Sequence, residues 1–252
     1  MPGDLTDSHA HLDLLKDPAA AVDVARQHGI ARIITVGCDL YSSRLAVELA
    51  SKHHCVAAAT GMHPHNAGSG GSQMYSALKE LAQLPDVVAV GEAGLDFYRD
   101  LSPRAAQEES FRCQIEIARQ VEKTLIVHTR DASQKTLEIL DECASGLTVV
   151  MHCFSLYDHV EECTRRGYYM SVAGNVTYEN ARDLRRAAAQ IPFNLLLTET
   201  DCPYLSPAPQ RGRPNSPENV RYTLKELARI RSCDEDKLAE QVKINFSTAF
   251  GV

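Results

Sequence analysis

Two histidines separated by a single residue, His9 and His11, lie near the start of the chain. On a β-strand they would project from the same face, because side chains alternate along a strand with a period of two. Imidazole is the commonest metal ligand among side chains, so such a pair can bind one divalent cation. Two ordinary surface or core histidines would give the same spacing, and a metal site therefore needs further ligands elsewhere in the chain.

Further candidate ligands and donors lie where short apolar runs end. They are His63, His65, Glu92, His128, His152 and Asp201. Four of the histidines (9, 11, 128 and 152) and the two carboxylates would be buried together on one rim if these runs were neighbouring strands. Titratable groups are costly to bury without partners, and bound cations would hold them. The sequence therefore predicts a metal site built from strand ends.

The apolar runs that must position these residues number eight, with helical patterns between them. They cover residues 4–9, 31–37, 55–60, 87–91, 124–128, 147–152, 168–172 and 194–199. Continuous apolar runs suit parallel strands that are covered on both faces. Eight strand-helix units in 252 residues predict an α/β fold, a single (β/α)8 TIM barrel whose active face is formed by the carboxyl ends of the strands. Residues 234–250 predict an extra C-terminal helix across the outside of the barrel, and residues 1–252 are expected to form one domain.

Composition limits the classes of function. Asp and Glu outnumber Lys and Arg by 33 to 26, so the chain has no overall attraction for nucleic acid, although bound cations would supply local positive charge. No apolar run approaches the roughly 18 residues of a membrane span, and the N-terminal residues do not resemble a secretory signal. The eight cysteines include no Cys-x-x-Cys pair and are interpreted as reduced thiols. We expect a cytoplasmic protein that acts as a monomer.

Six ordered motifs carry a family resemblance. DSHAHLD, GMHPH, GEAGLD, VHTRDA, HCFS and TETDCPYL, in this order and at these spacings, resemble the TatD family of metal-dependent hydrolases over residues 5–251. The resemblance implies a TIM barrel with two metal ions and a metal-dependent deoxyribonuclease activity that includes 3′-to-5′ trimming of single strands. It also implies that His9, His11 and Asp201 hold one metal, that His128 and His152 hold the other, and that Glu92 bridges both.

The implied arrangement is chemically coherent. A carboxylate such as Glu92 has two oxygens and can span cations about 3.5–4 Å apart, the spacing of two-metal hydrolytic sites. The cations, with zinc, magnesium and manganese as candidates, would lower the pKa of a water molecule, and Asp201 could accept its proton. Cys153 and Cys202 are next to candidate ligands in sequence but should point away from them, which favours buried thiols over further ligands.

Four residues could contact a phosphate without binding metal: His63, His65, Arg130 and Arg211. Arg130 could instead form an ion pair with Asp96 or Asp131. Arg211 could instead be a solvent-exposed residue of the proline-rich segment 201–217 with no role in substrate binding. That segment reads QRGRPNSP where family members often read HRGKRNEP, and HCFS is followed by Leu156 rather than glycine. These departures leave the ligands intact and bear on substrate preference.

The sequence therefore predicts a phosphodiesterase that acts on DNA, on single strands or on strand ends. Two alternatives remain. The same site could hydrolyse an ester or an amide, for example an aminoacyl-tRNA ester, or the chain could bind metal without catalysing a reaction. Chelation and an assay on end-labelled single-stranded DNA would separate the three.

Overall fold

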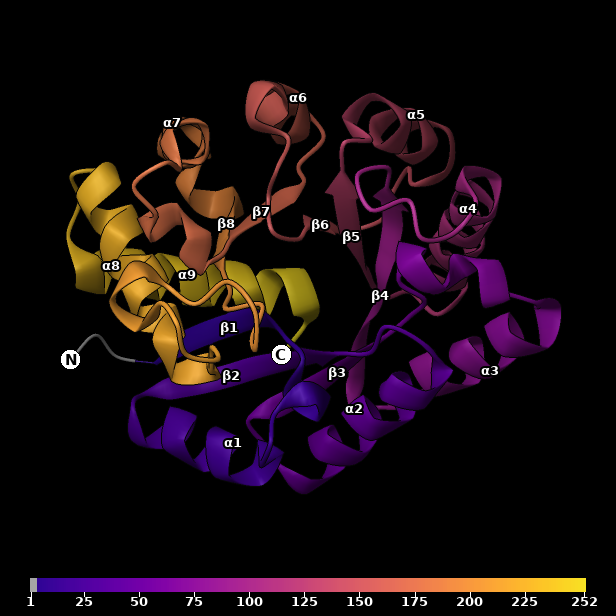
Figure 1. Ribbon diagram of the computed structural model, residues 1–252, viewed down its shortest axis with the longest axis horizontal. Helices are drawn as coiled ribbons and strands as arrows, with labels where there is room; N and C mark the ends of the chain where they lie inside the picture. The colour runs from indigo at the N-terminus through magenta and orange to yellow at the C-terminus, as the bar shows by residue number, and fades with distance from the viewer. Residues whose placement is uncertain (1–3) are drawn as a thin grey trace.

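Eight parallel strands form one barrel-shaped sheet in sequence order in the computed structural model, which describes residues 4–252 (Figure 1). The predicted (β/α)8 fold is thus confirmed. The strands are β1 (Leu5–Ala10), β2 (Ile30–Val36), β3 (Val56–Thr60), β4 (Val87–Asp96), β5 (Thr124–Arg130), β6 (Val149–Met151), β7 (Tyr169–Val172) and β8 (Leu196–Thr198).

Strand β4 is longer than its apolar run, because it continues through the GEAGLD motif to Asp96. Its register against β5 shifts between Val90 and Ala93. Gly94 has a φ of +143°, and a Cβ there would collide with the carbonyl oxygen of His128 on β5. Glycine therefore permits the close approach of the two strands. Glu92 lies inside the strand rather than after it.

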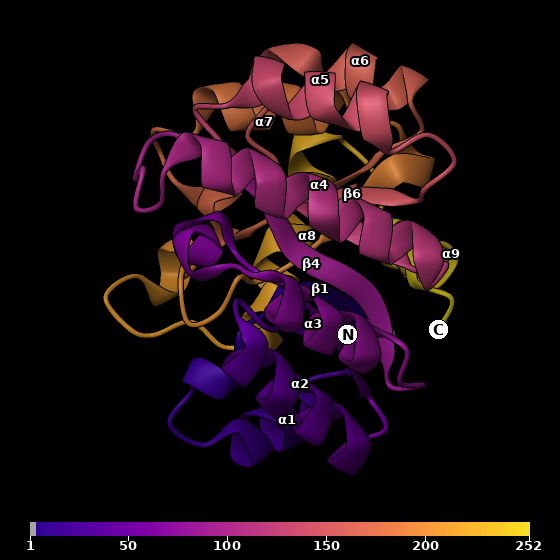
Figure 2. The same ribbon diagram turned by 90° about the vertical axis from the view of Figure 1, so that its right-hand side faces the viewer.

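One α-helix lies outside the sheet after each of the strands β1 to β7, and two helices follow β8. They are α1 (Pro18–Gln27), α2 (Leu40–Lys52), α3 (Ser72–Ala82), α4 (Arg104–Gln120), α5 (Ser133–Cys143), α6 (Val160–Arg165), α7 (Arg182–Gln190), α8 (Val220–Ile230) and α9 (Glu235–Phe250). Figure 2 shows α4 running across the outside of β4. Phe111, Ile115 and Ala118 form the buried stripe of α4, at the spacing that a core-facing helix requires.

The C-terminal helix α9 occupies a different place from the one expected. Its bounds match the predicted segment, but it closes the N-terminal end of the barrel instead of packing only on the outside. Phe246, Ala249 and Phe250 pack against residues that fill the barrel interior, among them Ile34 and Ile126. Open barrel ends expose apolar side chains, and the aromatic residues of α9 cover this one.

The barrel closes between β8 and β1 by a short seam at the opposite end. The backbone N–H of Asp201 donates to the carbonyl oxygen of His9 at 2.9 Å, and that of His11 donates to Cys202 at 2.8 Å. Three candidate ligands are therefore fixed by the same backbone hydrogen bonds. Within residues 4–252, no helix has the length and apolar character needed to cross a membrane.

Candidate metal centre

Glu92 lies at the centre of a cluster of imidazoles and is only 2% exposed. Its Oε2 is 3.3 Å from His9 Nε2 and 3.8 Å from His11 Nε2. Its Oε1 faces a different group, at 2.5 Å from His128 Nδ1 and 3.5 Å from His152 Nε2. The two oxygens of one carboxylate thus point to two separate sets of histidines.

Asp201 joins the first set. Its Oδ1 lies 3.4 Å from His11 Nε2, and the backbone at Asp201 has a φ of +54° as the chain turns out of β8. Burial raises the pKa of this carboxyl, but the contact with His11 and the charge of His152 outweigh it and lower the pKa. Asp201 is therefore ionised at neutral pH.

His63 joins the second set. It was expected to contact substrate, yet it is 9% exposed and its Nε2 lies 3.5 Å from Glu92 Oε1. Together with Glu92 and His128 it forms a group whose ligand atoms are all within 4.8 Å of one another. Its neighbour His65 takes a different partner, because its Nε2 lies 2.8 Å from Asp96 Oδ2.

These donors fit a divalent cation. Ligand atoms that share one cation are about 3–3.5 Å apart, because each metal-ligand bond is about 2.0–2.2 Å. Several contacts around Glu92 have this length, which is long for a hydrogen bond. Both ring nitrogens of His9 and Nε2 of His128 are buried without a hydrogen bond among residues 4–252. Buried nitrogens without a donor or acceptor are the expected signature of metal ligands.

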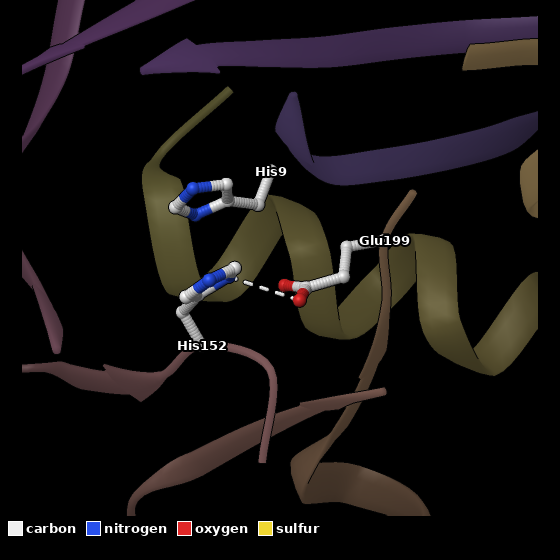
Figure 3. Close-up of side chains that lie close together, drawn as sticks. All are labelled: His9, His152 and Glu199. Carbon is white, nitrogen blue, oxygen red and sulfur yellow. Dashed lines mark ion pairs between the residues drawn. The ribbon is translucent and has the colours of Figure 1, made fainter. Parts of the chain in front are cut away.

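A second layer of polar groups orients the ligands. Glu199 is fully buried, and its Oε1 lies 2.9 Å from His152 Nδ1, while His9 stacks on His152 at 3.5 Å between ring centroids (Figure 3). The carbonyl oxygen of Val36 lies 3.0 Å from His11 Nδ1. Both contacts leave the Nε2 of the histidine facing Glu92, which is how outer partners fix the tautomer of a ligating imidazole.

Asp7 performs a similar role at the seam between β1 and β8. It is fully buried and accepts hydrogen bonds from the backbone N–H and the hydroxyl of Thr200, at 2.8 and 2.5 Å. Because Asp7 is two residues before His9 and Thr200 precedes Asp201, these hydrogen bonds tie the two ligand-bearing strands together.

The residues of the cluster shift one another's pKa values. Burial alone would lower the pKa of His152, but the charges of Glu199 and Glu92 raise it to about 9. For the carboxyl of Glu92 burial has the opposite effect and would raise the pKa. The charges of His152, His63 and His128 outweigh burial and lower this pKa well below the usual range. His63 behaves differently, because burial lowers its pKa to about 4 and keeps it neutral. The negative cluster therefore attracts positive charge, which protons or metal cations can supply.

The cluster forms the floor of a cavity of about 670 Å³, referred to below as the catalytic cavity. It is lined by His11, Leu14, Cys38, His63, His65, Asn66, Glu92, Asp96, Arg99, Leu101, His128, Arg130, His152, Asp201, Tyr204 and Leu205.

Three of the four expected phosphate contacts, His63, His65 and Arg130, thus lie on the cavity wall. Arg130 stacks on Tyr98 at 4.0 Å and, among residues 4–252, makes no ion pair with Asp96 or Asp131. The ion-pair alternative for this residue was wrong.

Arg211, the fourth expected contact, does not line the catalytic cavity. Its guanidinium lies over the ring of Tyr178 at 4.2 Å, in a neighbouring hollow. The sequence also missed the roles of Glu199 and Asp96, although Glu199 precedes Asp201 by two residues, a spacing that could have placed it beside the ligands. Cys202 is fully buried, and neither it nor Cys153 belongs to a cluster of ligand atoms among the described residues.

Known proteins resemble the chain over its full length. A profile described as TatD related DNase matches residues 6–251. An uncharacterized metal-dependent hydrolase of Bacillus subtilis, YabD, is 35% identical over 253 residues, which cover 98% of this chain and 99% of the relative. The 3′-5′ ssDNA/RNA exonuclease TatD of Citrobacter koseri is 34% identical over 245 residues, covering 94% of each chain. The crystal structure of the TatD homologue YjjV from Escherichia coli superposes with a TM-score of 0.93 at 28% identity and covers 100% of both chains.

Proposed function

The chain belongs to the TatD related DNase family of metal-dependent hydrolases, and on this premise we propose that it hydrolyses phosphodiester bonds at the ends of single-stranded DNA. The relative from Citrobacter koseri, which is named a 3′-5′ ssDNA/RNA exonuclease, supports this choice of substrate. The direction of trimming proposed for this chain is likewise 3′ to 5′.

One observation carries the proposal: the two oxygens of Glu92 face two different sets of histidines. We assign His9, His11 and Asp201 to one divalent cation, His128 and His152 to a second, and Glu92 to both. His63 is a further candidate ligand on the second side. A donor set rich in imidazole favours zinc over magnesium or manganese, which prefer oxygen ligands.

Divalent cations bound at this centre would lower the pKa of water and neutralise the charge of a phosphate. The protein's own residues account for the remaining chemistry. The ionised Asp201 accepts a proton as a water oxygen forms its bond to phosphorus. The P–O bond to the 3′ oxygen of the preceding nucleotide then breaks, and this oxygen takes up the proton that Asp201 accepted. The released nucleotide keeps a 5′-phosphate.

Substrate contacts are proposed for His63, His65 and Arg130 on the wall of the catalytic cavity. Arg130 can donate to a phosphate from its place beside Tyr98. His65, whose Nε2 contacts Asp96, lines the same cavity and can contact the substrate there. Glu92, at 2% exposure, lies deeper than these residues, so a scissile phosphate must enter the cavity to reach the metal centre. An unpaired strand end meets this requirement more readily than an intact duplex.

The test is an assay on single-stranded DNA labelled at its 5′ end, with metal content measured in parallel. We expect a ladder of shortened labelled products, released nucleotides that carry 5′-phosphates, and loss of activity in a chelator. Hydrolysis of an aminoacyl-tRNA ester or a small amide, with DNA left intact, would instead assign the same centre to acyl transfer. Metal binding without either activity would indicate a non-catalytic protein.

The remaining expectations about the chain's cellular context are also proposals. All eight cysteines are free, which supports a reducing compartment such as the cytosol. One chain supplies every member of the ligand clusters, which supports a monomer as the active species. We also propose that residues 1–252 form a single domain.

A further inference from the structure

A second depression lies beside the catalytic cavity and is not used by the proposed reaction. This outer groove has a volume of about 660 Å³ and is formed by the loop after β8, the end of the preceding 3-10 helix (Gly174–Thr177) and α8. Its lining includes Thr177, Ala208, Tyr222, the basic residues Lys225 and Arg229 and the acidic residues Glu226 and Glu235. A depression of this size can accommodate several groups of an extended chain.

A continuous surface joins the catalytic cavity to the outer groove. Leu205 lines the catalytic cavity, and the next residue, Ser206, accepts a hydrogen bond from the Tyr178 hydroxyl at 2.9 Å. Tyr178 and Arg211 line a small hollow of about 380 Å³, and Ala208 lines both this hollow and the outer groove. A chain that leaves the metal centre past Leu205 therefore meets the small hollow first and the outer groove next.

The side chains along this path have the chemistry of a single-strand binding surface. The Arg211 guanidinium lies 4.2 Å above the ring of Tyr178, and the ring of Tyr222 is half-buried at the outer groove. Aromatic rings stack on nucleobases and cations meet phosphates, which together bind single strands without reading their sequence. Among residues 4–252, neither Arg211 nor Lys225 forms an ion pair, so both charges are available.

Acidic residues line the path in the same number as basic ones, with Glu179, Glu226 and Glu235 beside Arg211, Lys225 and Arg229. Glu226 is paired with Arg229 at 2.7 Å. Residues 178–231 contain nine of the 26 Lys and Arg residues and six of the 33 Asp and Glu residues of the chain. Two of those six, Glu199 and Asp201, belong to the metal centre. The charge asymmetry lies in the wider segment 178–231, which is net positive while the rest of the chain is strongly acidic, and it favours a polyanion at this surface.

We propose that the outer groove, reached through the hollow between Tyr178 and Arg211, binds the part of a single-stranded nucleic acid that lies several nucleotides from the cleaved end. The inference rests on the proposed nuclease function and extends it, because it assigns a second binding region that uses no metal. Long strands should then bind more tightly than strands that fill only the catalytic cavity.

Binding of fluorescently labelled oligothymidylate of 12 nucleotides, measured by anisotropy in EDTA, tests the groove without metal or cleavage. The variant Arg211→Ala with Lys225→Ala removes two exposed cations that make no ion pair. We expect its affinity for the oligonucleotide to fall about tenfold, within the range measured for single-strand contacts. The slope of log affinity against log salt should decrease by about 1.4, because each lost phosphate contact on a single strand contributes about 0.7.

A matched control is Arg26→Ala with Arg32→Ala, two exposed cations near the N-terminal end of the barrel that, among residues 4–252, make no ion pair either. It removes the same charge far from the groove and should bind the oligonucleotide as the parent does. An oligonucleotide of the same length without bases should bind the parent more weakly, since stacking on Tyr178 and Tyr222 is lost. Poly-glutamate of equal charge should compete poorly.

Several results would overturn the inference: unchanged binding by the groove variant, an equal loss in the control variant, or equal competition by poly-glutamate. A separate readout distinguishes failure of the groove from failure of the proposed function. The metal-loaded groove variant should cleave a trinucleotide with the KM of the parent, while its KM for the longer strand rises. If the metal-loaded parent cleaves no oligonucleotide of either length, the nuclease proposal fails, and the EDTA measurement still reports on the groove.

Discussion

The two ends of the barrel interior are lined by the same strands and yet have opposite chemistry. At the N-terminal end, Ile34, Ile126 and Leu197 pack against Phe246 and Phe250 of α9. At the C-terminal end, the strands of the same barrel present imidazoles and carboxylates to the catalytic cavity. An apolar plug and a buried charged cluster are thus stacked along one axis.

The two ends of the barrel therefore make different contributions, one to the free energy of unfolding and the other to metal binding and catalysis. Burial of aromatic side chains is favourable in water, whereas burial of carboxylates and imidazoles is costly unless partners or cations compensate. The apolar end therefore contributes the free energy that keeps the strands in place. The polar end uses that rigidity to hold charged groups close together. Changes at the polar end should alter metal binding and activity with little effect on folding, and changes at the apolar end should do the reverse.

The largest effect expected at the polar end is that of Glu92→Gln. Loss of the charge weakens both sets of contacts at once, so activity should fall roughly a thousandfold, equivalent to the several kcal/mol that metal-assisted catalysis supplies. Metal content should fall while the fold is retained. Elemental analysis and circular dichroism, beside steady-state rates, check this, with the exposed Glu240→Gln as control. Near-normal turnover with full metal content would show that Glu92 does not bridge.

The corresponding change at the apolar end is Phe246→Ala. The ring is fully buried and lies 5.0 Å from that of Phe250, so its removal should lower the free energy of unfolding by about 3–5 kcal/mol. Urea denaturation measures this loss. The neighbouring, exposed Ile244→Ala should change it by less than about 0.5 kcal/mol. If Phe246→Ala abolished activity in protein that remained folded, the two ends would not be separable.

The double variant His9→Ala, His11→Ala tests whether the polar end contains two separate metal positions. It removes the imidazoles that face Glu92 Oε2 and leaves His128 and His152 in place. We expect metal content to fall by about one ion per chain, on the two-metal arrangement. If elemental analysis found the same number of metal ions per chain as in the parent, His9 and His11 would be ordinary core histidines and not metal ligands.

A smaller effect is expected for Glu199→Gln. The change removes the charge beside His152 Nδ1 while preserving shape, and loss of such an outer partner weakens metal affinity by about 10–100-fold. Titration with a competing chromophoric chelator measures the affinity directly. Glu162→Gln is a matched control, since Glu162 lies 2.9 Å from His159 Nδ1 on the surface, away from the centre. Equal metal affinities for both variants would show that Glu199 does not contribute to metal binding.

The last expected effect is graded with pH and amounts to no more than about tenfold for each pH unit. Because the pKa of His152 in the metal-free protein is raised to about 9, this histidine holds a proton at pH 7 that a cation must displace. Competition weakens as pH rises, so apparent metal affinity should increase by up to about tenfold per pH unit toward pH 9. The same chelator titration repeated from pH 6 to 9 checks the slope. A flat profile in the parent would show that the apo cluster carries no such proton.

Much of this arrangement could be predicted from the sequence alone. The apolar runs predicted eight strands, and local periodicity is enough for this because each strand is buried along its own length. The order of the motifs identified the candidate ligands His9, His11, Glu92, His128, His152 and Asp201, since parallel strands bring their carboxyl ends to one rim. The C-terminal helix was predicted with nearly correct bounds from its apolar spacing.

Tertiary structure decided what depends on distance between segments that are far apart in the chain. The sequence did not predict that β4 would continue past Glu92, because the extension follows from how closely Gly94 approaches β5. It could not place His63 within 3.5 Å of Glu92 or Arg211 in a neighbouring hollow, since both positions follow from loop paths outside the strands. The sequence also did not predict that α9 closes the barrel. An apolar stripe indicates that one face of a helix is buried, but it does not indicate which surface that face packs against. Side-chain contacts between remote segments are set by packing of the whole barrel, and local pattern carries no information about them.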